Sequence, residues 1–147
     1  MKGIYVKDAV RVCNGEILYG NENEVLENFT NDTREIKEGN VYIGFKGEHH
    51  DGSLLYRQAL VNGAKVCILQ KKSVYEILDV NQIQSEFPDR TIILVEDTTK
   101  AIGKIAEYKR SLYDIPVVGI TGSVGKTSTK DIIASVMGKK FNVLKTL

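Results

Sequence analysis

The residues best suited to chemistry lie near the carboxyl end, in the run Gly122-Ser123-Val124-Gly125-Lys126-Thr127. Its two glycines let the backbone turn tightly, with N–H groups pointing inward. Lys126 can reach the terminal phosphates of a nucleotide, and the Thr127 hydroxyl can ligate Mg²⁺. An apolar run at 117–120 precedes the loop and a helical pattern at 126–137 follows it, so the loop should lie at the positive end of a helix dipole. The sequence therefore predicts a binding site for a nucleoside triphosphate.

The loop departs from the commonest phosphate-binding pattern at one position. That pattern has a glycine five residues before its second glycine, where this chain has Ile120, and Gly119 lies one residue too early. A glycine-rich turn with an exposed lysine is the alternative interpretation. The strand-like run before the loop and the helix after it favour phosphate binding. Ser128 falls in the first helical turn, where its hydroxyl can contact phosphate or cap a free N–H group.

Strand patterns and helix patterns alternate along the chain. Apolar or β-branched runs predict strands, and apolar residues at helical spacing predict helices. Strands are expected at 16–19, 41–45, 66–69, 91–95, 117–120 and 141–144, and helices at 5–12, 54–62, 73–80, 98–112 and 126–137. We expect Leu54, Leu55, Ala59 and Leu60 to form the apolar face of the second helix. The alternation predicts an α/β architecture.

The order of these elements also predicts a domain boundary near 111–116. Residues 1–113 should form a compact α/β domain, and residues 114–147 the first strand, loop and helix of a parallel-sheet ATPase domain. Such a sheet needs further parallel strands, and the metal needs an acidic ligand downstream of the loop. We therefore expect the chain to be an amino-terminal piece of a longer protein.

The composition is that of an ordinary globular protein, with 42% hydrophobic and 27% charged residues and a net charge of +1. This balance lacks the basic excess typical of a nucleic-acid binder. No apolar run approaches the ~20 residues of a membrane span, and the amino terminus lacks a signal-peptide pattern. Cys13 and Cys67 have no metal-ligand spacing and are expected to be reduced thiols. A cytoplasmic protein without membrane insertion is expected, and the sequence does not indicate an oligomeric state.

The phosphate loop also carries a family resemblance. The run 118–130 resembles the ATP loop of the Mur ligases, a family that characteristically lacks the early glycine. Within it, Ser123-Val124 and Thr129-Lys130 are most similar to the family member that adds D-alanyl-D-alanine.

Residues nearer the amino end extend the resemblance over essentially the whole chain. Asn31-Asp32-Thr33-Arg34 is similar to the family's Asp-Ser-Arg element, with threonine in place of serine. The run 39–52 resembles its strand-and-loop signature, although Ser53 stands where the family often has histidine.

The resemblance implies a function and a division of labour. An amino-terminal domain would bind the UDP end of a UDP-N-acetylmuramoyl-peptide, a central domain would bind ATP and Mg²⁺, and a carboxyl-terminal domain would bind D-alanyl-D-alanine. The implied reaction is ATP-driven amide formation through an acyl phosphate, in peptidoglycan precursor synthesis. Lys126 would be the catalytic lysine that offsets charge on the γ-phosphate. Because this chain would hold only the first domain and the opening of the second, we expect it to have no ligase activity alone.

Four residues are candidates for the UDP site. Thr33 offers a hydroxyl, and Arg34 could pair with a phosphate or instead with Asp32 or Glu35. Lys46 and Gly47 follow a predicted strand beside a loop, which is a common ligand position, although a solvated lysine is also consistent. The adjacent Glu48-His49-His50-Asp51 is interpreted as a polar loop over the substrate and not as a metal site, because neighbouring residues in a loop seldom converge on one ion.

Three alternatives remain open. One is another Mur ligase, such as the enzyme that adds the third residue of the stem peptide. Another is a non-catalytic UDP-sugar-binding module. The third is a nucleotide-dependent switch protein, although the sequence has no Asn-Lys-x-Asp segment to read guanine.

Overall fold

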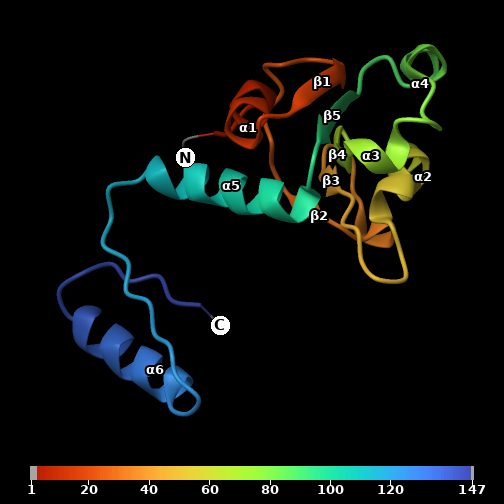
Figure 1. Ribbon diagram of the computed structural model, residues 1–147. Coiled ribbons are helices and arrows are strands. Elements are labelled where there is room, and N and C mark those ends of the chain that lie inside the picture. The colour runs from red at the N-terminus through yellow and green to blue at the C-terminus, as the bar shows by residue number, and fades with distance from the viewer. Residues whose placement is uncertain (1–2, 147) are drawn as a thin grey trace. The chain divides into compact units, whose positions relative to one another are not determined.

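The computed structural model describes residues 3–146 (Figure 1). The chain divides into two compact units, Met1–Tyr113 and Asp114–Leu147. The first contains a β-sheet with helices on both faces, and the second contains a loop and one helix.

The first unit is built on a five-stranded sheet of order β1-β5-β4-β3-β2. Its strands are β1 (Glu16–Tyr19), β2 (Phe29–Thr30), β3 (Val41–Ile43), β4 (Val66–Gln70) and β5 (Thr91–Val95). Strands β2 to β5 are parallel, and β1 joins the edge antiparallel to β5. The two longest strands pair without interruption from Val66 opposite Thr91 to Gln70 opposite Val95. The expected α/β class and the four strands predicted before residue 100 are confirmed, although the strand expected at 41–45 ends at Ile43. The short strand β2 was not predicted.

Helices cover the two faces of this sheet and create two cores. Helices α1 (Val6–Cys13) and α5 (Thr98–Ser111) pack on one face (Figure 1). The other face carries the 3₁₀ helix η2 (Gly52–Leu55) and helices α2 (Tyr56–Val61), α3 (Lys71–Val74) and α4 (Val80–Glu86). Because successive strand residues point to opposite faces, Ile68 enters the first core while Cys67 and Leu69 enter the second. A sheet buried on both faces explains why its strands are continuous apolar runs.

Two helix predictions in this unit are wrong in detail. Residues 75–79 of the helix expected at 73–80 are not helical. They lie between α3, which ends at Val74, and α4, which begins after Asp79 accepts the N–H of Gln82 at 3.1 Å. The helix expected at 54–62 begins with a 3₁₀ turn. Leu54 and Leu55 lie in that turn and are 49% and 46% exposed, while the polar Ser53 is fully buried.

The second unit contains α6 (Lys126–Met137), as predicted, but neither predicted strand. Residues 117–120 and 141–144 have no strand pairing within the described range 114–146. Val117 and Val118 are each 65% exposed. A strand exists only when its backbone groups pair with a neighbour, and this unit offers no partner strand, so apolar composition alone does not produce one.

Three further observations concern the whole described range, residues 3–146. None of its helices has the length and apolarity needed to cross a membrane. Cys13 and Cys67 are free thiols, and burial raises the pKa of the Cys67 thiol. Among these residues, no group of three or more His, Cys, Asp or Glu side chains is placed to hold a metal ion.

Candidate functional site

The predicted phosphate loop leads directly into α6 through two glycines with positive φ. Gly122 has φ 146° and Gly125 has φ 82°. A Cβ atom added to Gly125 would meet nothing within 4 Å, so the backbone conformation and not space requires glycine there. Gly125 is the N-cap of the helix, and its carbonyl accepts the Thr129 N–H at 2.9 Å. The turn therefore delivers the chain into the first helical turn without a side-chain cap.

The side chains around this turn suit an anion. The Lys126 ammonium folds back and donates to the Gly122 carbonyl oxygen, which keeps its charge beside the loop. The first turn of α6 has neither a side-chain cap nor an acidic residue, so its N–H groups remain available to phosphate oxygens. Thr127 and Ser128 lie in this same exposed turn. The hydroxyl of Thr127 therefore has the chemistry and the position expected for a ligand to a phosphate-bound Mg²⁺.

The second group of predicted residues gathers at one edge of the sheet in the first unit. Parallel strands β2 and β3 are neighbours, so the segments that follow them leave the sheet at the same edge. Thr33 and Arg34 follow β2, and Lys46 and Gly47 follow β3. The carboxyl edge of a parallel sheet is where ligands of open α/β folds commonly bind. The topology therefore places these two pairs of residues at the same edge of the sheet, although they are 12 to 14 positions apart in the sequence.

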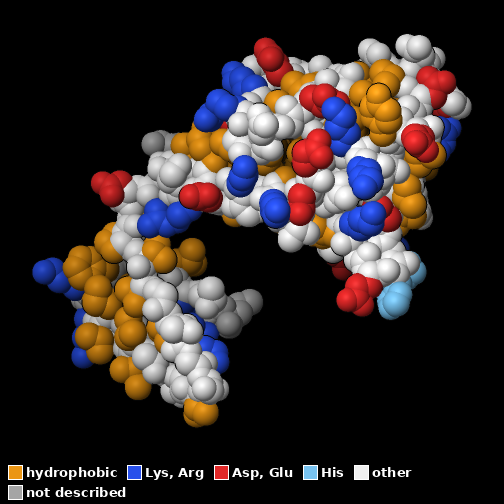
Figure 2. Space-filling view, in the orientation of Figure 1, with side chains coloured by type: hydrophobic (Ala, Val, Ile, Leu, Met, Phe, Trp, Pro, Cys, Tyr) orange, Lys and Arg blue, Asp and Glu red, His pale blue; other side chains and the backbone are white. Residues whose placement is uncertain are grey.

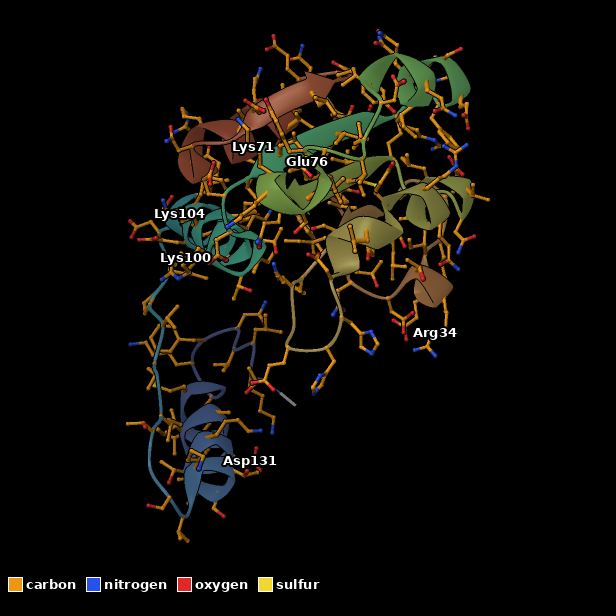
Figure 3. All side chains as sticks on the ribbon, turned by 45° about the vertical axis from the view of Figure 1, so that its right-hand side comes forward. Arg34, Lys71, Glu76, Lys100, Lys104 and Asp131 are labelled. Carbon is orange, nitrogen blue, oxygen red and sulfur yellow. The ribbon has the colours of Figure 1, made fainter. Side chains whose placement is uncertain are left out.

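Arg34 is already paired in this structure. It lies in the short 3₁₀ helix η1 (Thr33–Glu35) and points outward (Figure 3). Its Nε and Nη2 donate to the Asp32 carboxylate at 2.9 Å and 2.5 Å. These side-chain hydrogen bonds, with one from the Arg34 backbone N–H, lower the pKa of Asp32 to about 2. Of the two acidic partners considered from the sequence, Asp32 is the one that pairs, and a phosphate would have to share the guanidinium with it.

Thr33 differs from Arg34 in exposure. Thr33 is only 7% exposed, and its carbonyl oxygen accepts the Asn62 side-chain amide at 2.8 Å. Asn62 follows helix α2, so this bond ties η1 to the helix beside it. The segment after β2 is therefore held on two sides, by Asn62 and by the Asp32 cap.

Lys46 and Gly47 belong to a tight loop that returns on itself. Lys46 forms an isolated antiparallel bridge with Asp51, and the Gly47 N–H donates to the His50 carbonyl at 2.8 Å. Residues 46–50 are all exposed, including both histidines. The loop presents a cation and polar side chains beside the edge where Thr33 and Arg34 lie.

The sequence prediction named Asp51 and Ser53 but missed Ser73 and the hydrogen bonds that all three residues make beneath this loop. Asp51, Ser53 and Ser73 join the loop to the ends of strands β3 and β4 through hydrogen bonds. The Asp-x-Ser spacing at 51–53 was the available signal, because an aspartate commonly accepts the N–H two residues ahead of it. Its partner Ser73 is 22 positions away from Asp51, and no local pattern indicates that contact.

The larger described cavity does not coincide with either predicted site. A groove of about 590 Å³ lies between α5 and the segment before β2, lined by Ile4, Leu26, Phe29, Ile102, Ile105 and their neighbours. Its lining is mainly apolar, so few groups there could recognise a phosphate or a sugar.

Comparisons with known proteins agree with the fold and with the family resemblance. No protein-family profile matches the chain. The chain is 36% identical over 121 residues to the UDP-N-acetylmuramoyl-tripeptide--D-alanyl-D-alanine ligase of Synechocystis sp.. The aligned residues make up 82% of this chain and 24% of that protein. Over the residues compared, it corresponds to the amino-terminal region of a Mur ligase.

Further relatives include a second kind of Mur ligase. The Bacillus subtilis D-alanyl-D-alanine ligase is 32% identical over 125 residues, covering 85% of this chain and 25% of that protein. The UDP-N-acetylmuramoyl-L-alanyl-D-glutamate--2,6-diaminopimelate ligase of Clostridium perfringens is 31% identical over 137 residues, covering 91% of this chain and 26% of that protein. The chain spans about a quarter of the length of the curated relatives it matches.

Solved structures of this family share the fold. The Thermotoga maritima MurF ligase, solved in complex with ADP, is 34% identical with a TM-score of 0.65, covering 82% of this chain and 25% of that one. An Acinetobacter baumannii MurF structure superposes with a TM-score of 0.74 over 95% of this chain and 28% of its own, and at 22% identity this shows the fold alone.

Proposed function

We propose that the chain is the amino-terminal part of an ATP-dependent Mur ligase that adds D-alanyl-D-alanine to UDP-N-acetylmuramoyl-tripeptide in peptidoglycan precursor synthesis. The observation that carries the proposal is the glycine-lysine loop at the start of α6. It joins a turn with two positive-φ glycines, an uncapped helix terminus and a lysine folded over the loop. The relatives with 36% and 32% identity are named for this reaction.

In this proposal the second unit binds the phosphates of ATP. The N–H groups of the first turn of α6 face the phosphate oxygens, and Lys126 offsets the negative charge that develops when the substrate carboxylate attacks the γ-phosphate. The Thr127 hydroxyl would hold Mg²⁺, which would supply further positive charge at the phosphates. The incoming amine then displaces phosphate from the acyl phosphate, using residues outside this chain. A cytoplasmic location follows, because UDP-linked precursors and ATP would both have to reach the site.

The first unit is assigned the uridine nucleotide of the muramoyl substrate. Thr33 and Arg34 after β2, with Lys46 and Gly47 after β3, are the proposed contacts at the carboxyl edge of the sheet. Arg34 keeps most of its side chain in solvent, 85% exposed, while its inner N–H groups bind Asp32. Its remaining donors can therefore face a diphosphate.

The second candidate is the ligase that adds the third residue of the stem peptide. The observation in its favour is the Clostridium perfringens match, whose 31% identity over 91% of this chain is close to the 32% identity over 85% of the chain for the Bacillus subtilis protein. Both candidates share the UDP and ATP chemistry, and they differ in the muramoyl peptide and the incoming amine.

Calorimetric titration of the 147-residue chain tests the assignment of both units. We expect binding of UDP-N-acetylmuramoyl-tripeptide and of UDP, and weaker binding of Mg-ATP. Arg34→Ala should weaken UDP binding about tenfold, the loss of one charged hydrogen-bonding group, without changing ATP binding. The matched control is Arg57→Ala, because Arg57 is also an exposed arginine in an ion pair, with Glu86, but lies in α2.

The ATP assignment needs its own variant and control. Lys126→Ala should abolish measurable Mg-ATP binding and leave UDP binding unchanged. Lys139→Ala removes the same charge after the end of α6 and should preserve both. Binding of Mg-ATP with no binding of either uridine ligand would remove the muramoyl assignment and leave only a phosphate loop.

A further inference from the structure

The exposed loop at 46–50 is anchored by several hydrogen bonds at its base. Five consecutive exposed residues have no apolar packing to hold them. Ordering each residue of such a segment costs backbone entropy, so other contacts must offset that cost. The loop closes with the Gly52 N–H donating to the Phe45 carbonyl at 2.7 Å, in addition to the Gly47–His50 bond.

Asp51 is the residue on which the anchoring depends. One carboxylate oxygen accepts the Ser53 N–H at 3.0 Å, and the other accepts the Ser73 hydroxyl at 2.5 Å. Ser73 lies in α3, directly after β4, so this bond connects the loop after β3 to the neighbouring strand's end. One side chain therefore fixes the outgoing end of the loop to two separate segments.

Ser53 provides a second, fully buried connection between the same strands. Its hydroxyl donates to the Gly44 carbonyl at 2.9 Å and accepts the Gln70 N–H at 2.9 Å. Tyr42 adds a bond to the Gly52 carbonyl at 2.7 Å. Gly44 has to be glycine here, since a Cβ atom would lie 2.5 Å from the Ser53 nitrogen. The inner network belongs to the packing of the fold, whereas the Asp51–Ser73 bond lies outside it, among partly exposed groups.

We propose that Asp51 and Ser73 are positioning residues of the uridine-nucleotide site, holding the Lys46–His50 loop across the carboxyl ends of β3 and β4 before the ligand arrives. The inference rests on the proposed function of the first unit. Neither side chain is assigned a contact with the nucleotide. Their effect is to remove the ordering cost from the binding step, which is how preorganisation raises affinity.

A positioning role and a purely structural role predict different effects of losing the Ser73 hydroxyl. A positioning role affects mainly the affinity for UDP, whereas a structural role affects mainly the stability of the fold. Ser73 makes one partly buried hydrogen bond, so its loss should lower the thermal midpoint by no more than about 5 °C. The same loss should weaken UDP binding about tenfold, because the loop must then be ordered by the ligand. Asp51→Ala removes both anchors and should weaken UDP binding further than Ser73→Ala.

The experiment is a UDP titration of the 147-residue chain and its variants, with amide hydrogen exchange at Gly47 and Gly52 in the absence of ligand. Ser73→Ala should weaken UDP binding and speed exchange at both amides, and Ser73→Thr, which keeps the hydroxyl, should restore both. Ser111→Ala is the matched control, because this variant also loses one hydroxyl hydrogen bond. The Ser111 hydroxyl donates to the Tyr108 carbonyl at 2.7 Å, at the carboxyl end of α5. This control should change neither quantity.

The possible results separate this inference from the function beneath it. If the wild-type chain binds UDP and Ser73→Ala binds it equally well, the positioning role is overturned while the proposed function stands. If Ser73→Ala lowers affinity only in proportion to a large fall in thermal midpoint, the residue is structural and the inference fails. If the wild-type chain binds no uridine ligand, the proposed function itself fails, and the positioning role fails with it.

Discussion

The two units of this chain contain segments of similar composition that differ in secondary structure and in burial. Val66-Cys67-Ile68-Leu69 and Val117-Val118-Gly119-Ile120 are both short apolar runs. The first is a central strand with all four residues buried, and the second has no strand pairing and is largely exposed. Figure 2 makes the same contrast, with hydrophobic side chains spread over the surface of the second unit. Strand structure and burial depend on neighbours, which the first unit has and the second lacks within the described residues.

The sharpest test of this contrast is one substitution made in both units. Ile93 lies in β5 and is 1% exposed, whereas Ile132 lies in α6 and is 64% exposed. Ile93→Ala should lower the free energy of unfolding by about 2–5 kcal/mol, because it removes buried methyl groups and leaves a cavity. Ile132→Ala should change it by no more than about 0.5 kcal/mol.

Urea unfolding followed by circular dichroism measures both changes, since the chain has no tryptophan. A loss near 2 kcal/mol for Ile132→Ala would contradict the comparison, because it would require that residue to be buried in solution.

Two glycines extend the comparison from packing to backbone shape. Gly44 is crowded by the Ser53 backbone, so Gly44→Ala should cost about 1–3 kcal/mol of global stability. Gly125 has open space but φ 82°, so Gly125→Ala strains only the local turn, by about 1–2 kcal/mol. The second variant should unfold like wild type in urea and bind Mg-ATP about tenfold more weakly.

Gly103→Ala provides the control for both glycine variants. Gly103 lies inside α5 and does not have a positive φ, and a Cβ atom added to it would meet nothing within 4 Å. Alanine there should stabilise the first unit by about 0.5–1 kcal/mol. Destabilisation by Gly125→Ala as large as that by Gly44→Ala would show that the two units unfold as one.

The smallest expected effects are shifts in the pKa of two surface carboxylates, one in each unit. Arg34 hydrogen bonds lower the pKa of Asp32 to about 2, and a hydrogen bond from Lys145 lowers the pKa of Asp131. A lowered pKa favours the folded state at pH values above the ordinary value of 3.8, and for Asp32 that contribution is lost as the pH falls from 3.8 to about 2. Arg34→Met and Lys145→Met should each move the partner's pKa back toward 3.8.

Carboxylate titration by NMR measures both values. Similar behaviour in the two units would sharpen the comparison, because an ion pair needs only two adjacent side chains whereas a buried strand needs a sheet. An Asp131 pKa of 3.8 in the wild-type chain would mean that its pair with Lys145 does not form in solution.

The sequence alone determined the elements that depend on local pattern and chemistry. Strands β1, β3, β4 and β5, helices α1, α5 and α6, and the glycine-lysine turn follow from apolar spacing and from backbone angles that only glycine adopts easily, whereas the short strand β2 was not predicted. The tertiary structure decided what depends on distant partners. It left 117–120 without a strand partner and joined Asp51 to Ser73 across 22 positions. Strand pairing and hydrogen bonds of this kind form only when two segments that are distant in the sequence lie side by side. A local sequence pattern does not indicate which distant segment will be the partner.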